Sequence, residues 1–235
     1  YNKLILSGSG AKTTVGSTAI TVSDTFRIAG SPATFALGSS STLTYGASAV
    51  LEYAGTAAQT VGFTEWPSNG ALSIPPTVVI NNSSGVTVGL TTPQPRRLIG
   101  SSGGSNGTLV LKSGLLQNSS NVRIYSPSTI VRIGGTLSSL PDSLTNLTVN
   151  YQNISPISTS TEFGVVNSTS LGGTVTLSTV SLTINNSSTV TLSANRQVNG
   201  SISLTNGTLD ISTFTLTSRG SLNRTNGIIT ATSGT

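Results

Sequence analysis

The sequence has no cysteine, no histidine and no methionine in its 235 residues. Without cysteine there are no disulfide bonds. Without cysteine and histidine there are no thiolate or imidazole metal ligands, no cysteine nucleophile and no catalytic triad that needs histidine. Charged residues make up only 7% of the chain, whereas about a third of it is serine or threonine, so hydroxyl groups must take over the solubilising role of charges. These absences predict a protein that is not an enzyme and holds no metal or cofactor.

The net charge of +5 comes from eleven cations and six anions spread along the chain, and the one adjacent basic pair is Arg96-Arg97. Nucleic-acid binding needs clustered lysine and arginine, so we expect no nucleic-acid partner. No apolar run approaches the roughly 18 residues of a membrane helix, so we expect no membrane span. Tyr1 is not a methionine and no leader pattern follows it, which favours a processed product or an excised segment.

Short segments in which apolar residues alternate with threonine or serine recur along the chain, for example at 19–22, 42–45, 147–149 and 174–177. This period of two, with many β-branched residues, predicts β-strands. Clusters of glycine, asparagine, serine and proline lie between them and predict turns. No segment has a 3.6-residue apolar stripe, so we expect an all-β protein without a long helix.

Two phrases repeat within the chain. The segment 79–88, with its Asn-Asn-Ser-Ser turn, returns at 183–192, and a phrase of two turn residues, a hydroxyl residue and an aliphatic residue recurs at 106–109, 134–137 and 206–209, among others. Such repetition favours a parallel β-helix (β-solenoid) of about nine to eleven rungs, with asparagine amides stacked at its corners. Tandem antiparallel β-sandwiches are the alternative. We expect one domain over 1–235, with possible subdivision near 70–76 and 141–160.

Four stretches carry a resemblance to a known group of proteins: 1–14, 51–61, the triplet Glu65-Trp66-Pro67, and 80–87. They resemble the repetitive regions of very large secreted surface proteins of Bacteroidetes. The resemblance implies an adhesin-like β-helix that is exported to the cell surface. It implies a structural role and transfers no catalytic residue.

Side chains of several kinds are candidates for a binding site. The six acids are far apart in sequence, whereas a glycosidase or lyase needs carboxylates together on one face. Arg123 and Arg132 lie in strand-like triplets and either line a groove for anionic polysaccharide or simply point outward into water. Tyr53 and Trp66 either form a sugar-stacking platform or, in the case of Trp66 with Phe63, plug a rung corner.

Asn-x-Ser/Thr triplets are abundant, which predicts either glycan attachment or turn chemistry in a secreted chain. The candidate glycosylation sites are Asn82, Asn106, Asn118, Asn186 and Asn206.

The outermost predicted strands, 3–6 and 228–230, carry no predicted helix, charged cover or proline block. An uncapped rung exposes unpaired backbone N–H and C=O groups. We therefore expect end-to-end stacking on another copy of the chain or on neighbouring repeats of a longer chain. The junction would be formed by Leu4, Ile5, Leu6, Ile228 and Ile229.

The expected function is a non-enzymatic extracellular structural protein, an adhesin segment or a fibre subunit. The alternative is a polysaccharide-binding or polysaccharide-degrading β-helix.

Overall fold

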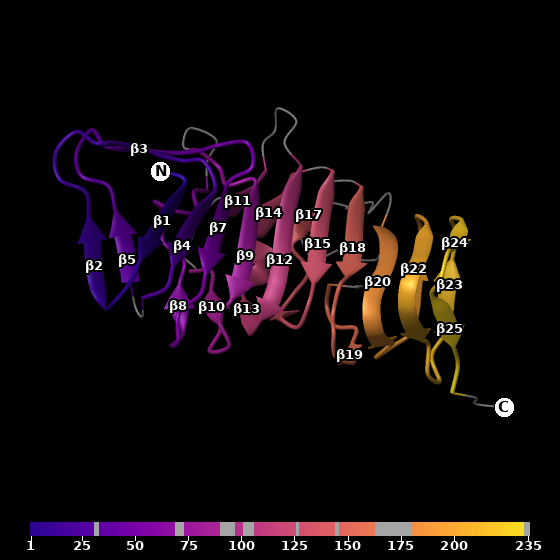
Figure 1. The fold of residues 1–235 in the computed structure, drawn as a ribbon. Coiled ribbons are helices and arrows are strands. Elements are labelled where there is room, and N and C mark those ends of the chain that lie inside the picture. The colour runs from indigo at the N-terminus through magenta and orange to yellow at the C-terminus, as the bar shows by residue number, and fades with distance from the viewer. Residues whose placement is uncertain are drawn as a thin grey trace.

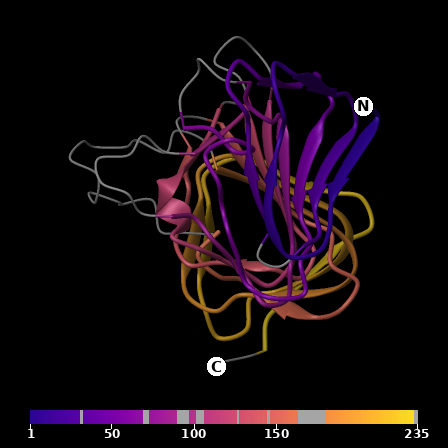
Figure 2. The same ribbon diagram turned by 90° about the vertical axis from the view of Figure 1, so that its left-hand side faces the viewer.

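The structure, a computed structural model, describes residues 1–30, 33–68, 73–89, 97–100, 106–125, 127–143, 146–162 and 180–232. Its strands pair in parallel in every ladder, and successive turns of chain stack along one axis (Figures 1 and 2). The fold is a parallel β-solenoid of about eight turns, slightly fewer than the nine to eleven expected. Parallel ladders throughout the described residues exclude the antiparallel sandwiches.

The longest sheet runs the length of the rod, and its strands lie side by side in Figure 1. Along its path it pairs, in order, β1 (Lys3–Leu6), β4 (Thr25–Ile28), β7 (Val50–Tyr53), β9 (Thr77–Asn81), β12 (Gly107–Ser113), β15 (Ser128–Arg132), β18 (Leu147–Tyr151), β20 (Val180–Thr191), β22 (Ile202–Asp210) and β24 (Leu222–Arg224). Two further strands join it by pairing with β20 and β22, namely β19 (Ile157–Ser158) and β25 (Ile228–Thr230).

Shorter sheets close the other sides of the coil. One pairs β8 (Gln59–Thr60), β10 (Val86–Thr87), β13 (Leu115–Gln117) and β16 (Thr136–Leu137), and another pairs β11 (Arg97–Ile99), β14 (Val122–Ile124) and β17 (Asp142–Ser143). Three pairs complete them: β2 (Gly10–Thr13) with β5 (Ala33–Ala36), β3 (Ala19–Val22) with β6 (Thr42–Tyr45), and β21 (Arg196–Val198) with β23 (Leu216–Ser218). In the described part of the chain, the 3₁₀ turn Ser119–Asn121 is the one helical element, and no helix there is long and apolar enough to cross a membrane.

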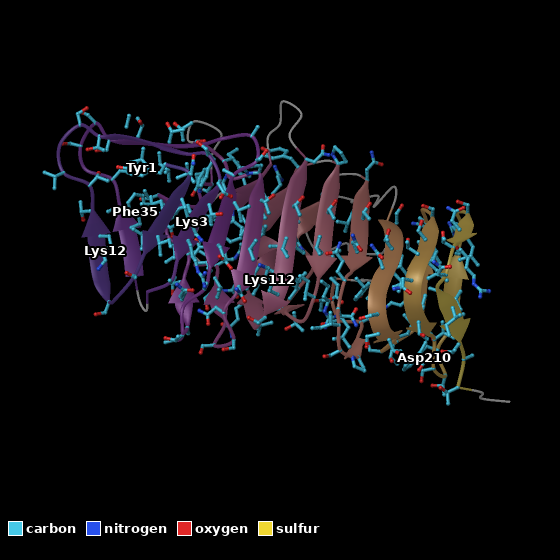
Figure 3. All side chains as sticks on the ribbon, viewed as in Figure 1. Tyr1, Lys3, Lys12, Phe35, Lys112 and Asp210 are labelled. Atoms are coloured by element: carbon cyan, nitrogen blue, oxygen red, sulfur yellow. The ribbon has the colours of Figure 1, made fainter. Side chains whose placement is uncertain are left out.

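The core consists of apolar columns that run along the rod, because in-register pairing places equivalent residues of successive rungs above one another. Side chains accompany the sheet along its whole length in Figure 3. One inward column contains Leu4, Phe26, Leu51, Val78, Leu109, Ile130, Val149, Leu182, Ile202 and Leu222. From Phe26 to Ile202 its members are buried. Each such side chain contributes about 1.5–3 kcal/mol, so the columns hold the rungs together.

The second Asn-Asn-Ser-Ser phrase differs from the expectation of a turn between two strands. Residues 185–188 lie inside the continuous strand β20, where the ladder to β22 shifts register between Ile184 and Thr189. The neighbouring rung accommodates the same bend at Gly207, whose φ is +85°. The strand therefore bends at the corner of the coil without ending.

Four successive rungs occur twice, and we call residues 50–143 the first unit and residues 147–230 the second unit. β7–β8 corresponds to β18–β19, β9–β10 to β20, β12–β13 to β22, and β15–β16 to β24–β25. Gly114 and Gly207 mark the correspondence, since each has positive φ and each lies two residues before a buried leucine, Leu116 or Leu209. The repeat unit of the molecule is therefore larger than one rung.

Candidate functional site

A carboxylate lies inside the coil of the first unit. Glu65 is 2% exposed, and its Oε1 atom accepts hydrogen bonds from the Tyr53 hydroxyl at 3.2 Å and the Gly62 amide at 2.5 Å. Its backbone carbonyl accepts the Tyr45 hydroxyl at 2.6 Å. Burying a carboxylate is costly unless it is hydrogen-bonded, so these donors explain how the core holds an acid.

Arg97 supplies the nearby cation from the next rung. It is buried at the start of β11 and donates Nη1 to the Trp66 carbonyl at 2.9 Å. Its guanidinium carbon lies 3.7 Å from the centroid of the Phe63 ring. Trp66 is fully buried and donates its indole N–H to the Leu98 carbonyl at 2.9 Å, so its ring packs into the corner of the coil.

Burial dominates the titration of this cluster. It raises the pKa of Glu65 above the ordinary value of 4.5, against the hydrogen bonds and the Arg97 charge that favour the ionised form. Burial lowers the pKa of Arg97, opposed by Tyr53 and Glu65. Burial, with the Glu65 charge, raises the pKa of Tyr53 well above 10.0, so its phenol stays protonated and remains a donor.

Glu162 in the second unit accepts the same two kinds of donor, but its cation forms an ion pair with it and comes from the opposite side. Glu162 Oε1 accepts the Tyr151 hydroxyl at 2.8 Å and the Ser160 amide at 2.9 Å. Arg132, in the preceding rung, forms an ion pair with Glu162 and donates Nη1 to the Ser158 carbonyl at 2.6 Å. Burial, followed by the Glu162 charge, raises the pKa of Tyr151 well above 10.0, which keeps this phenol a donor as well.

The interpretation of Arg132 as an outward side chain or a groove residue is therefore wrong. Arg132 is 4% exposed and points into the core, whereas its neighbours Val131 and Ile133 are only half-buried. Arg123, on β14, is half-buried between two buried residues and so faces outward, in register with Asp142. The two arginines lie on different sheets and face opposite ways, so they do not line one groove.

The sugar-stacking platform expected at Tyr53 and Trp66 is not formed by these two rings. Both are buried, with centroids 6.0 Å apart, and neither offers a face to solvent. Phe63 is the exposed aromatic side chain beside them, and the Arg97 guanidinium lies against its ring.

Two of the five candidate glycosylation sites are core residues. Asn82 Nδ2 donates to Gln59 Oε1 at 2.9 Å, and Asn186 Nδ2 donates to Asn153 Oδ1 at 2.8 Å. These corner amides stack from rung to rung as expected, and the nitrogen that would carry a glycan is buried. Of the other three, Asn106 and Asn206 are exposed, while Asn118 is half-buried and donates Nδ2 to the Val88 carbonyl at 3.1 Å.

The remaining described acidic side chains do not gather. Asp24 accepts a bond from Thr25, Glu52 pairs with Arg27 at 3.5 Å, and Asp210 accepts the Ser212 amide. The side chain of Asp142 lies outside the described part. Within that part, no group of three acids could hold a metal ion.

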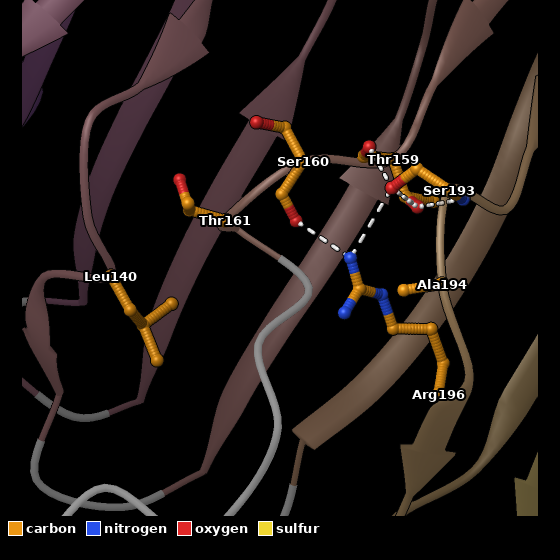
Figure 4. Close-up of a pocket in the computed structure, with 7 residues that line it drawn as sticks. All are labelled: Leu140, Thr159, Ser160, Thr161, Ser193, Ala194 and Arg196. Atoms are coloured by element: carbon orange, nitrogen blue, oxygen red, sulfur yellow. Dashed lines mark hydrogen bonds between the residues drawn. The ribbon is translucent and has the colours of Figure 1, made fainter.

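A surface groove of about 530 Å³ lies beside the second cluster (Figure 4). It is lined by Leu140, Thr159, Ser160, Thr161, Ser193, Ala194 and Arg196. Arg196 opens β21 as Arg97 opens β11, and its Nη2 lies 3.4 Å from the Ser160 carbonyl and 3.3 Å from Ser193 Oγ. In the first unit the Arg97 guanidinium lies against Phe63 and binds the carbonyl of Trp66, which follows Glu65, whereas Arg196 binds the carbonyl of Ser160, which precedes Glu162.

The rungs at the two ends carry most of the exposed apolar surface. Among the described residues, six of the eight large exposed apolar side chains belong to them: Tyr1, Ile5, Val15, Leu222, Ile228 and Ile229. Leu222 and Ile229 are 55% and 41% exposed, although their partners one rung below, Ile202 and Leu209, are buried. The inward columns thus reach the end face uncovered.

The five predicted junction residues fall into two groups. Leu4 and Leu6 pair with the buried Phe26 and Ile28, so they belong to inward columns, as does Ile229. Ile5 pairs with Arg27, and Ile228 with the half-buried Thr208, so both lie on the outward side of their strands. A stacked rung would enclose the inward group in the apolar core, whereas the outward group would stay on the solvent-facing side of the junction.

Comparison of the chain with protein-family models, with curated proteins and with solved structures finds no match. Function must therefore be argued from the residues themselves.

Sequence analysis missed the two buried acid clusters, although a signal for them exists. Each glutamate lies in a Thr-Glu-aromatic triplet, 64–66 or 161–163, and follows a tyrosine by twelve or eleven residues. An acid beside an aromatic residue in an otherwise almost uncharged chain, repeated at the same distance from a tyrosine, indicates a structural cluster.

Proposed function

We propose that the chain is a non-enzymatic structural rod that is extended by stacking further parallel rungs on its end faces. The observation that carries the proposal is the apolar columns that reach those faces, which end in the half-buried Leu4 on one side and in the exposed Leu222 and Ile229 on the other. Head-to-tail stacking is a heterologous contact that does not close, so it produces a filament. The resemblance to secreted surface proteins favours an extracellular location, as an adhesin segment or a fibre subunit.

The acids support a non-enzymatic role. Both buried glutamates are occupied by tyrosine and amide donors inside the core, where no substrate can reach them. Hydrolysis of a glycan needs two carboxylates that flank an accessible bond. Incubation with neutral and acidic polysaccharides should release no product; release that is abolished by replacing one acid would refute this part of the proposal.

Sedimentation velocity over a concentration series, with electron microscopy of the same samples, tests stacking. The wild-type chain should form rods longer than one molecule. Leu4→Lys and Ile229→Lys should reduce this association by about tenfold or more, because each buries a charge in an apolar column. Ile5→Lys and Ile228→Lys are matched controls on the outward side and should associate like the wild type. A wild-type chain that stays monomeric at high concentration, or equal loss in all four variants, contradicts stacking between copies of the chain.

A polysaccharide-binding role is the second candidate, and the groove in Figure 4 favours it. Hydroxyls of Thr159, Ser160 and Ser193 beside the Arg196 guanidinium suit a hydroxylated, acidic sugar. Arg196→Ala should weaken binding of an oligogalacturonate measured by calorimetry, while Arg219→Ala, at an exposed arginine, should not. Absence of measurable binding by the wild type removes this candidate.

A further inference from the structure

Arg224, in the rung of β24–β25, occupies the same place as Arg132 in the rung of β15–β16. The two arginines belong to one column of the main sheet, above Leu204 and Leu111 respectively. Each begins an Arg-x-x-Gly turn and donates its Nε to the carbonyl of that glycine, at 2.6 Å to Gly227 and at 2.9 Å to Gly135. The side chains are therefore held in the same orientation.

The backbone around the two turns matches as well. The amides of Thr225 and Gly227 donate to the Leu204 carbonyl at 3.0 and 3.3 Å. The amides of Ile133 and Gly135 donate to the Leu111 carbonyl at 2.9 and 3.1 Å. The apolar residues that follow also correspond, since Leu137 pairs with Leu116, and Ile229 pairs with Leu209.

The two rungs differ in what covers them. Tyr151 stacks one rung above Arg132, and Glu162 and the Ser158 carbonyl bind its guanidinium, which leaves Arg132 buried. In the described residues no strand lies above β24, and Arg224 is exposed. Ile130 and Leu137, under the cover, are 0% and 3% exposed, whereas their counterparts Leu222 and Ile229 are 55% and 41% exposed.

We propose that the open face of β24–β25 is the docking surface for a parallel β-rung of the kind formed by residues 147–162, which places an aromatic ring over Arg224 and a carboxylate beside its guanidinium. This inference rests on the part of the proposed function in which further rungs extend the end face, and it names as occupant a rung that differs from the chain's own first rung. Charge complementarity selects the partner, because a buried guanidinium needs a carboxylate. The first rung of a second copy of the chain does not provide one: residues 1–23 contain no acid, and they carry Lys3 and Lys12.

The test extends the chain by one rung of the proposed kind. Ile229 corresponds to Leu137, so residues 1–230 are followed by a second copy of residues 139–162. A longer version, with a copy of 139–198, covers the added rung in turn. Hydrogen–deuterium exchange is measured for the amides of 222–230 in the parent chain and in both extended chains. We expect the extension to slow exchange of these amides by about tenfold or more, because a docked rung must open before they exchange.

Three substitutions identify the contact. In the extended chains, Arg224→Gln and Glu162→Gln in the added copy should each remove most of the added protection, because either leaves one buried charge without its partner. In the parent chain, Arg224→Gln should change exchange of 222–230 by less than about twofold, since the guanidinium there is solvated. Arg219→Gln, at an exposed arginine nearby, is the matched control and should have no effect in either chain.

The outcomes separate this inference from self-stacking. Added residues that stay unprotected in both extended chains overturn it, as does protection that survives Glu162→Gln in the added copy. Concentration-dependent protection of 222–230 in the parent chain, lost in Leu4→Lys and unchanged by Arg224→Gln, identifies a second copy as the occupant and also overturns it. A parent chain that stays monomeric while the extended chain gains protection through Arg224 supports the inference and contradicts only self-assembly.

Discussion

Each unit buries a glutamate inside an apolar coil. The nearby arginine comes from opposite directions along the rod in the two units. In the first unit Arg97 comes from the rung after Glu65, and the rung before it places Ile28 below Tyr53. In the second unit Arg132 comes from the rung before Glu162 and lies directly below Tyr151. The tyrosine hydroxyl and the backbone amide are common to both. The donors of the glutamate's own rung therefore define the site, and a neighbouring rung on either side supplies its charge.

The stacking of rungs explains why the cation can come from either neighbouring rung. Each position in a solenoid rung touches the equivalent positions above and below, so a charge at one level is reached equally well from both neighbours. The difference has a consequence at the surface. Where Arg97 faces Phe63 the corner is filled, and where Arg196 faces Ser160 a groove remains.

Removing the cation of the second cluster should cause the largest loss of stability. Arg132→Leu leaves the carboxylate of Glu162, whose side chain is 0% exposed, without its ion pair. We expect a loss of about 3–5 kcal/mol in the free energy of unfolding, measured by urea denaturation.

The double variant Arg132→Leu with Glu162→Gln tests the cause. It should recover a large part of the loss, because no uncompensated charge is then buried. Arg219→Leu controls for the loss of an exposed arginine and should lie within about 0.5 kcal/mol of the wild type. If the double variant is no more stable than Arg132→Leu, the loss comes from packing and the electrostatic account is wrong.

The corner glycines of the two units should differ in how much stability is lost when each is replaced by alanine. A Cβ at Gly114 would lie 1.8 Å from the backbone carbonyl oxygen of Asn82. At Gly207 it would lie 2.0 Å from the side-chain oxygen of Asn186, which can move only by giving up its hydrogen bond to the Ser188 amide, and 2.9 Å from two backbone oxygens. Gly114→Ala should therefore cost more than Gly207→Ala, about 3 against about 2 kcal/mol in urea denaturation. Gly8→Ala, with positive φ in open space, isolates the conformational part and should cost about 1 kcal/mol. Equal losses at Gly114 and Gly207 would show that the corners are not distinguished by this contact.

Much of the fold is predictable from the sequence, because strand periodicity and repeated phrases are local signals that survive stacking. The expected strands at 19–22 and 42–45 are confirmed at their residue bounds as β3 and β6. The amide stacking of Asn82 and Asn186 is confirmed because a turn phrase that repeats must repeat at a corner. Parallel pairing itself follows from the repetition, since identical residues in successive rungs favour in-register ladders.

The sites are less predictable, and Arg132 shows why. In Val131-Arg132-Ile133 the alternation identifies two faces, and an arginine is normally assigned to the wet one. The residue that reverses this assignment, Glu162, lies thirty residues later in another rung. The sequence of a single rung contains no information on the charges of its neighbour. The face that Arg132 occupies therefore cannot be assigned until the register between neighbouring rungs is known. For Trp66 the sequence leaves a sugar platform and a corner plug open, and its complete burial decides for the plug. Tyr53 is buried as well, because rarity in a polar chain marks core anchors as well as binding platforms.

The smallest expected change in stability comes from the protonation of Glu65 in the first cluster. Burial raises the pKa of Glu65 above 4.5, so between that value and the raised one the folded state keeps a proton that the unfolded chain has released. Unfolding then releases a proton, and stability falls as pH rises through this window. Glu65→Gln keeps an acceptor for Tyr53 but does not titrate, so its stability should change less with pH over the same range. We expect the two proteins to differ by on the order of 1 kcal/mol, visible in urea midpoints collected from pH 4 to pH 8.

Asp24→Asn, at an exposed side chain, should follow the wild-type curve. A wild-type curve that rises with pH in this window, or a Glu65→Gln curve parallel to it, would show that the Arg97 charge outweighs burial and that Glu65 is stabilised as the ion.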